Sequence, residues 1–164
     1  MAVLPIVYGP APIFQQPAQP VSVFNQQLVD KLCNMAETLY YHQAWGIGAN
    51  MVGFLDQIIV VDLQEDGRKN LYKIVNPIIQ SSSQTYSSLP ESSLSFPGIR
   101  VVVKRPSAIV VSYQDETGKV YELAADGMLA RVIQHEMDYL EGKTFLERIS
   151  PTKKQMCLLK YQKR

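Results

Sequence analysis

Two adjacent residues, a histidine and a glutamate, carry the clearest chemical signal in the sequence. His135 and Glu136 open a five-residue segment that ends at Tyr139. Because residues four apart share one face of a helix, the pattern His-Glu-x-x-His brings two imidazoles to one metal ion and places the glutamate beside the metal-bound water. Tyr139 stands where the second imidazole would be. Taken alone, this segment favours a buried histidine beside a surface glutamate.

Other nitrogen and sulfur ligands for a metal are scarce. His42 is the only other histidine, and the two cysteines, Cys33 and Cys157, stand in no C-x-x-C or similar spacing. A disulfide framework is therefore not expected, and the cysteine usage fits a protein of the reducing cytoplasm. Any transition-metal site would have to be assembled from this short set together with weaker donors.

The element that must position the His-Glu pair is a helix over residues 127–141. Asp126 is its expected N-cap and Gly142 its expected stop. Within this range the apolar residues recur at helical spacing, namely Leu129, Val132, Ile133, Met137 and Leu140.

Two further helices are expected. Residues 25–41 carry an apolar stripe that should face the core, made of Leu28, Leu32, Met35 and Leu39. The last helix begins with Ser150 as its cap and Pro151 in its first turn, and runs to about Tyr161. After Glu147 this tail is basic and contains no acid, with Arg148, Lys153, Lys154, Lys160, Lys163 and Arg164.

Strand signals fill most of the middle of the chain. Runs of β-branched residues predict strands over residues 57–63, 71–76 and 99–103. Residues 108–114 and 119–123 flank a turn with Gly118 and predict an antiparallel hairpin. The segment 80–88, rich in Ser, Gln and Thr, is predicted to be a loop. Strands followed by a long helix predict an α+β fold in which antiparallel sheet packs around the helix of His135.

Composition indicates one globular domain. The chain has 164 residues, of which 46% are hydrophobic and 19% charged, and its formal net charge is +1. These values argue against disorder and against a strongly basic DNA-binding protein. The apolar start over residues 1–7 is broken by Pro5 and is too short for a membrane span or a signal peptide. No membrane partner is therefore expected.

Three separated segments resemble, in order and spacing, the three signature motifs of the peptide deformylases. They are residues 46–53 (GIGANMVG), 91–98 (ESSLSFPG) and 134–142 (QHEMDYLEG). Residues 8–14 (YGPAPIF) are similar to the start of that family, and the basic last helix is similar to its C-terminal helix. The resemblance thus covers the whole length of the chain.

The resemblance implies a fold and an activity. Peptide deformylases remove the formyl group from the N-terminal formyl-methionine of new proteins. In that family a Cys of the second motif and both His of the third bind the metal, and the Glu acts as general acid and base. A Gln of the first motif and the backbone N–H of the Leu after the Cys hold the oxyanion.

Carried over position by position, the family pattern is only partly present. The chain keeps His135, Glu136 and Leu94. Ser93 stands at the position of the metal-binding Cys, and Tyr139 at that of the second His. The first motif is two residues shorter, so that Met51 stands directly before Val52-Gly53 where the Gln belongs, and Ser92 replaces a Gly of the second motif.

Each departure weakens the chemistry that the family pattern implies. A cysteine thiol ordinarily has a pKa of about 8.5 and binds metal as thiolate, whereas a serine hydroxyl stays neutral. A tyrosine phenol, with an ordinary pKa of about 10, ionises only on a strongly acidic metal. Met51 has no hydrogen-bond donor. We therefore expect no cofactor or, at most, a divalent iron or zinc held weakly at His135.

Structural roles for the same residues are the alternative. His135 would be a hydrogen-bonded interior imidazole, Tyr139 a core aromatic residue, and Ser93 a strand or turn residue bonded locally. Glu136 would be a carboxylate left in a closed or remodelled pocket.

Three functions remain open at this stage. The first is an inactive or very weakly active protein that binds a methionine-like N-terminus or formyl-methionyl peptide, in a pocket lined by Gly46, Ile47, Gly48, Leu94 and Val132. The second is deformylation or other amide hydrolysis, with a metal held by an altered ligand set of His135, Tyr139, Ser93 and Glu136. The third is a structural or ribosome-associated role that uses the basic C-terminal helix.

Overall fold

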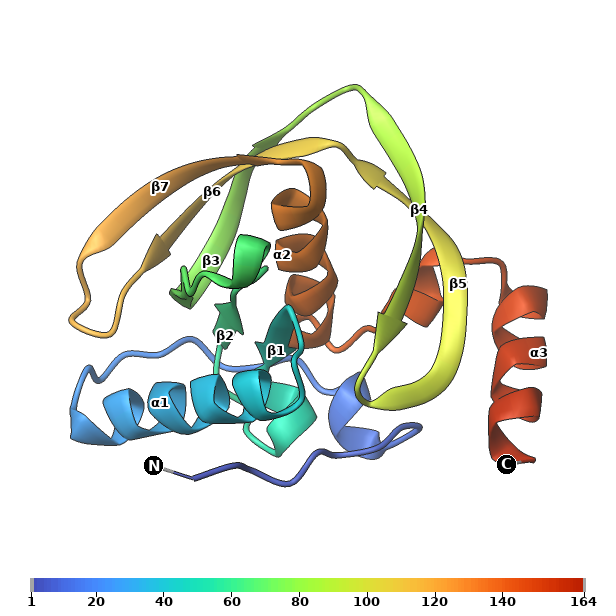
Figure 1. Cartoon of the computed structure of the whole chain (residues 1–164), viewed down its shortest axis with the longest axis horizontal. Helices are drawn as coiled ribbons and strands as arrows, with labels where there is room; N and C mark the ends of the chain where they lie inside the picture. Colours follow the sequence, from blue (N-terminus) through green and yellow to red (C-terminus); the bar gives the residue numbers. More distant parts are fainter. Residues whose placement is uncertain (1, 164) are drawn as a thin grey trace.

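The computed structural model describes residues 2–163 and places helix α2 (Gly127–Leu140) between two antiparallel sheets. Figure 1 shows α2 at the centre of the molecule, with the larger sheet on one side and the smaller sheet on the other. This is the α+β arrangement that the sequence predicts. It gives α2 two covered faces, and most of its residues are buried.

The larger sheet has five strands in the order β1-β2-β3-β6-β7, and every neighbouring pair is antiparallel. Its strands are β1 (Gly46–Gly48), β2 (Ile58–Val61), β3 (Tyr72–Ser82), β6 (Ala108–Gln114) and β7 (Val120–Asp126). The predicted hairpin is confirmed, since β6 pairs with β7 from Ala108 opposite Asp126 to Gln114 opposite Val120. Gly118 has a φ of 88° in the connecting turn, which suits a residue without a side chain.

The smaller sheet pairs β4 (Tyr86–Ser93) with β5 (Phe96–Pro106). Along β5 the side chains alternate between the interior and the solvent, because successive residues of a strand point to opposite faces. The buried set is Ile99, Val101, Val103 and Arg105, and the exposed set is Arg100, Val102 and Lys104. One charged residue, Arg105, therefore shares the interior face with three aliphatic ones.

The loop predicted over residues 80–88 is wrong for most of its length. Strand β3 continues to Ser82 and β4 begins at Tyr86, so the connection between them is short. Serine and threonine on strands whose outer face meets water give the polar composition of a loop, and composition alone cannot separate the two cases. Strand β5 also extends on both sides of the predicted residues 99–103.

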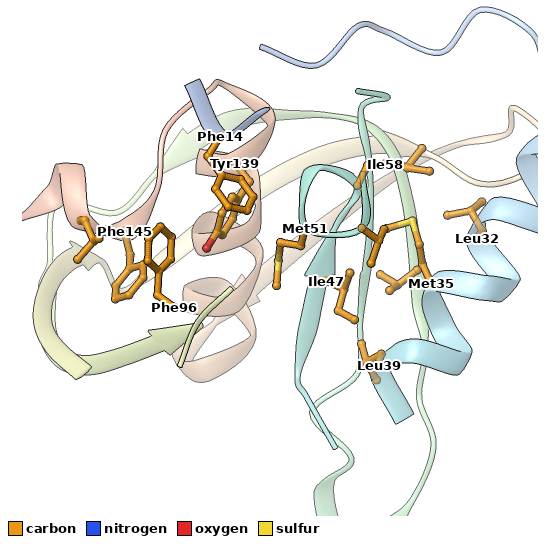
Figure 2. Packing of buried hydrophobic residues seen from close by; sticks show 14 of the residues in the cluster. Phe14, Leu32, Met35, Leu39, Ile47, Met51, Ile58, Phe96, Tyr139 and Phe145 are labelled. Atoms are coloured by element: carbon orange, nitrogen blue, oxygen red, sulfur yellow. The ribbon is translucent and has the colours of Figure 1, made fainter. Parts of the chain in front are cut away.

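Helix α1 (Gln26–Tyr41) packs its apolar stripe against the larger sheet. The Asn25 side chain accepts a hydrogen bond from Leu28 N–H and so caps the first turn. The stripe predicted from the sequence is buried. Figure 2 shows Leu32, Met35 and Leu39 of α1 facing Ile47 and Ile58 of the neighbouring strands. A second apolar cluster fills the space between the sheet and α2.

The boundaries of α2 largely follow the prediction. The helix ends at Leu140, one residue before the predicted limit, and Gly142 takes a φ of 76° just beyond it. Asp126 stands at the N-cap position, but its side chain makes no capping hydrogen bond. The helix is therefore held by its packing between the sheets rather than by that cap.

Helix α3 (Pro151–Gln162) lies at the periphery, against β5 and the short helix η4 (Phe145–Arg148). Ser150 caps it by accepting a hydrogen bond from Lys153 N–H, as predicted. Two of the basic residues in this tail are paired with acids elsewhere in the chain: Arg148 with Asp138, and Lys154 with Glu147. None of the helices in residues 2–163 is long and apolar enough to cross a membrane.

Candidate functional site

A pocket of about 610 Å³ lies where α2 faces β1 and β4. Strand β1 contributes Gly46, β4 contributes Glu91 and Ser93, and α2 contributes His135 and Glu136. The chain thus brings its first, second and third motifs to one cavity. Further lining residues come from the N-terminal segment, the segments before and after β1, the β4–β5 turn and α2: Ile6, Tyr8, His42, Trp45, Met51, Leu94, Met128, Arg131 and Val132.

His135 is held by an acid of the second motif. Its Nδ1 lies 2.8 Å from Glu91 Oε1, and both side chains are buried. Burial lowers the pKa of His135, but the charges of Glu136 and Glu91 and the hydrogen bond to Glu91 outweigh burial and raise it. The imidazole orientation is therefore fixed from the Nδ1 side.

Glu91 also binds two buried arginines. Arg105 donates to both carboxylate oxygens, at 2.6 and 2.9 Å, and Arg131 donates to Oε2. Burial raises the pKa of Glu91, but the hydrogen bonds from His135 and Arg105 outweigh burial and lower the pKa to about 2. Glu91 is thus an ionised carboxylate whose charge is already matched by its neighbours.

The same network ties α2 to strand β5 and to the short helix η4, which follows α2 in the chain. Arg105 Nη1 donates to Asp138 Oδ2 across 3.0 Å, and Arg148 Nη2 donates to Asp138 Oδ1 across 2.6 Å. Arg105 and Asp138 are almost completely buried, whereas Arg148 is partly exposed. A buried arginine shared between two acids is satisfied on both sides, which is what burial of charge requires.

Ser93 and Tyr139 bond to each other. Their hydroxyl oxygens lie 2.7 Å apart, and Ser93 Oγ also accepts from Ser95 N–H across 3.2 Å. Tyr139 is fully buried, with Phe14 edge-on to its ring at a centroid distance of 5.2 Å (Figure 2). Burial raises the pKa of the Tyr139 phenol well above its ordinary value, and the neighbouring carboxylates add to this effect.

Glu136 is the unsatisfied group of the pocket. Only 4% of the residue is exposed, and its Oε1 has no hydrogen-bond partner. Burial and the nearby charge of Glu91 raise the pKa of Glu136 to about 7, although the charges of His135 and Arg105 and a hydrogen bond from the Gly48 backbone oppose this shift. The carboxyl lies close against β1, since a Cβ atom added at Gly46 would be 2.8 Å from Glu136 Oε2.

The short turn after β1 places a thioether in the first motif. Met51, in η2 (Ala49–Val52), is 1% exposed, and its Sδ accepts the Gly48 N–H across 3.4 Å. Asn50 points elsewhere, because its Nδ2 lies 3.4 Å from the carbonyl oxygens of Ile13 and Gln16. Asn50 therefore does not replace the missing amide of the first motif.

Seven of the residues singled out from the sequence meet at the cavity, and three, Ile47, Gly48 and Tyr139, do not line it. Met51, Leu94, Val132, His135 and Glu136 line the pocket together with Gly46 and Ser93. Ile47 differs from the prediction: it is fully buried in the core beside α1, because its side chain points to the opposite face of β1 from Gly46. Gly48 has no side chain, and its backbone packs against Glu136 and Tyr139 of α2.

Sequence reasoning missed the roles of Glu91, Arg105 and Arg131. A signal for Arg105 was present, because it continues the alternating positions of Ile99, Val101 and Val103 toward the interior. A charged residue at an inward position needs a buried partner of opposite charge. That requirement would have directed attention to the acid of the second motif.

Comparison with known proteins identifies the family. The family model for polypeptide deformylase matches residues 3–155, which is most of the chain. The chain belongs to the peptide deformylase family. A peptide deformylase-like protein of Rickettsia conorii is 42% identical over 158 residues, covering 96% of this chain and 86% of the relative. The peptide deformylase of Brucella suis is 36% identical, covering 99% and 94%.

Solved peptide deformylases share the fold. The structure from Ehrlichia chaffeensis in complex with actinonin superposes with a TM-score of 0.93 at 33% identity, covering 99% of this chain and 98% of that one. The Legionella pneumophila structure gives a TM-score of 0.92 at 33% identity, covering 98% and 94%. This chain therefore has the α+β architecture of a peptide deformylase.

Proposed function

We propose that this member of the peptide deformylase family binds peptide N-termini in its pocket and does not deformylate them by the metal chemistry of its family. The observation that carries the proposal is the Ser93–Tyr139 pair, in which two neutral hydroxyls occupy the positions of a thiolate and an imidazole and bond to each other. In the family motifs described above, these two positions hold a metal-binding Cys and a metal-binding His.

The donor set does not fit an iron or zinc ion. The Tyr139 phenol is fully buried and its pKa is raised, so it stays protonated and is a poor ligand at neutral pH. Ser93 is a neutral hydroxyl as well. Across residues 2–163, no three His, Cys, Asp or Glu side chains come together as a group that could hold a metal ion. His135 alone remains as an ordinary ligand at this point, which is too few for a structural or catalytic site.

The chain's own residues still form a binding site. The pocket combines apolar lining from Leu94, Met128 and Val132 with polar groups from Glu91 and Glu136, the composition typical of small-ligand sites. The Ehrlichia chaffeensis relative is solved in complex with actinonin, which supports ligand binding by this fold. Without a hydroxide made by a metal, Glu136 has no activated water on which to act.

Two measurements on the purified protein test this proposal. We expect less than about one-tenth of an equivalent of iron, zinc or nickel in protein prepared anaerobically without chelator. We expect formyl-Met-Ala-Ser or Met-Ala-Ser to bind in calorimetric titration while formyl-Met-Ala-Ser stays uncleaved. Stoichiometric metal together with release of formate would overturn the proposal in favour of an active enzyme with an altered ligand set.

A further inference from the structure

We propose that the outward face of helix α3 is a docking surface for an anionic phospholipid membrane. The outward face is made of Lys153, Met156, Leu159, Lys160 and Lys163, all of which are exposed. None of these five residues lines the pocket. The inference therefore goes beyond the proposed binding of peptides and does not depend on it.

Helical spacing gives α3 two different faces. Cys157, Leu158 and Tyr161 share one side of the helix and pack partly against the core. The outward face lies on the other side, where Met156 is 63% exposed and Leu159 is 52% exposed. Two large apolar side chains thus remain in water on a helix that already has a face packed against the core.

The charge of the outward face is positive and is not compensated within residues 2–163. Helix α3 contains no acid, and Glu147 is the last acid of the sequence. Glu147 already pairs with Lys154, which does not belong to the outward face. No ion pair joins any of the three outward lysines to an acid of the described chain. Positive charge gathered on one side of a helix complements a surface that presents phosphate groups.

The exposed apolar side chains favour a lipid surface over a nucleic acid. The phosphates of RNA would attract the same lysines, but they offer no apolar layer for Met156 and Leu159. Stacking of RNA bases would need a free aromatic ring, and the ring of Tyr161, the aromatic residue of α3, lies 5.9 Å from that of Phe96. In a bilayer the apolar side chains enter the boundary of the acyl chains, while the lysine ammonium groups stay among the headgroups.

Such a contact is peripheral and does not require a spanning segment. Helix α3 has 12 residues, and it lies at the edge of the molecule beyond β5 in Figure 1. None of the helices in residues 2–163 is long and apolar enough to cross a membrane. The sequence-based expectation of no membrane partner rests on residues 1–7 and concerns spanning segments and signal peptides. The proposed surface contact of α3 revises that expectation.

Cosedimentation of the full chain with vesicles tests the proposal. Vesicles of phosphatidylglycerol and phosphatidylcholine in equal parts are compared with vesicles of phosphatidylcholine alone. At low salt we expect half-maximal binding at a lipid concentration at least about tenfold lower for the anionic vesicles. Binding to them should weaken as the salt concentration rises. The triple variant Lys153→Gln, Lys160→Gln, Lys163→Gln should lose the difference between the two kinds of vesicle.

A matched control removes three exposed charges elsewhere. Arg68 and Lys69 lie in the connection between β2 and β3, and Lys119 lies in the turn between β6 and β7. In Figure 1 that turn is at the opposite end of the molecule from α3. The triple variant Arg68→Gln, Lys69→Gln, Lys119→Gln changes the net charge by the same amount and should bind anionic vesicles as the unchanged chain does.

A second variant separates lipid from other polyanions. Met156→Ser with Leu159→Ser keeps every charge and alters two exposed side chains, so it should fold normally and bind anionic vesicles at least about fivefold more weakly. Equal binding of the unchanged chain to anionic and neutral vesicles would overturn the proposal. It would also be overturned if the lysine variant lost binding while the serine variant kept it in full, because the face would then recognise phosphate charge alone, as in RNA. Either result would leave the proposed peptide binding untouched, since that is measured by calorimetry without lipid.

Discussion

At the scale of single residues, the pocket is set apart by the protonation states of its side chains. Glu91 is held ionised by two arginines and a histidine, whereas Glu136, on the same cavity, has a pKa raised to about 7 by burial. Tyr139 and Ser93 are neutral hydroxyls that satisfy each other. A site of this kind offers one unmatched carboxyl and no thiolate. It is better suited to bind a hydrogen-bond donor than a transition metal.

Restoring the family ligands should restore metal binding. We expect the double variant Ser93→Cys with Tyr139→His to take up about one equivalent of iron, nickel or zinc, because it provides a thiolate and a second imidazole beside His135. Metal analysis after purification without chelator measures this. Each single change serves as control and should bind far less. A double variant that stays free of metal would show that Ser93 and Tyr139 are not what prevents metal binding.

Deformylation by that double variant, expressed per bound metal ion, should remain well below full activity. Met51 still lacks a donor, and loss of one oxyanion donor typically lowers the rate by roughly 10²- to 10³-fold. Formate release from formyl-Met-Ala-Ser, expressed per bound metal, is the measurement. Full activity per metal would mean that the first motif contributes nothing to oxyanion stabilisation in this chain.

The ionised carboxylate of Glu136 should destabilise the folded protein at neutral and alkaline pH. Its pKa is raised from 4.5 to about 7 on folding, so the folded state binds the proton more tightly and stability falls as pH rises from about 4.5 to about 7. Glu136→Gln removes this penalty. We expect it to raise the free energy of unfolding at pH 8 by up to about 3 kcal/mol and to change it little at pH 4.5. Urea denaturation at the two pH values measures this; an equal effect at both would contradict it.

At the scale of elements, the charged network fixes α2 between its two sheets. Arg105 of β5 reaches Glu91 on β4 and Asp138 on α2, and Asp138 in turn holds Arg148 of η4. Three elements therefore meet at one buried arginine, and Asp138 joins η4 to them. The pocket depends on this arrangement, because the carboxylate that orients His135 belongs to the same network.

Arg105→Ala should be strongly destabilising. It removes a side chain that is 1% exposed and leaves Asp138 and Glu91 with fewer partners in the interior. Breaking a buried ion pair costs about 3–5 kcal/mol, and we expect a loss in that range by chemical denaturation. Arg100→Ala, on the exposed face of the same strand, is the matched control and should change stability by less than about 0.5 kcal/mol. Similar losses for the two variants would refute a structural role for the network.

At the scale of the whole molecule, the elements with regular periodicity were predictable from the sequence. The stripe of α1, the hairpin of β6 and β7 and the extent of α2 follow from apolar spacing and turn residues. Strand β4 was not predictable in this way, because its serines and Pro90 have the composition of a loop and it is paired only with β5. The motifs predicted which residues meet, but not that Ile47 faces the core or that Glu91 binds two arginines. Those contacts are set by strand alternation and by pairs far apart in sequence.

The peripheral position of α3 leads to a prediction about the molecule as a whole. None of its residues is fully buried; Cys157, Leu158 and Tyr161 pack partly against the core, with the Tyr161 ring 5.9 Å from that of Phe96. No residue of α3 lines the pocket. A chain ending at Ser150 should therefore lose about 1–3 kcal/mol of unfolding free energy, as expected for three half-buried side chains.

The same truncation should leave peptide binding intact. The pocket lies on α2, β1 and β4, and the buried network that holds these elements ends at Arg148, before the truncation point. We expect the affinity for Met-Ala-Ser to stay within about twofold of the full chain, measured by calorimetric titration at a temperature where circular dichroism shows both forms folded. The full chain carrying Tyr161→Ala separates lost packing from lost charge, because it removes the contact with Phe96 and keeps every lysine. A large loss of affinity in the truncated form alone would mean that α3 acts on the pocket through its charge, in conflict with its position beyond β5 in Figure 1.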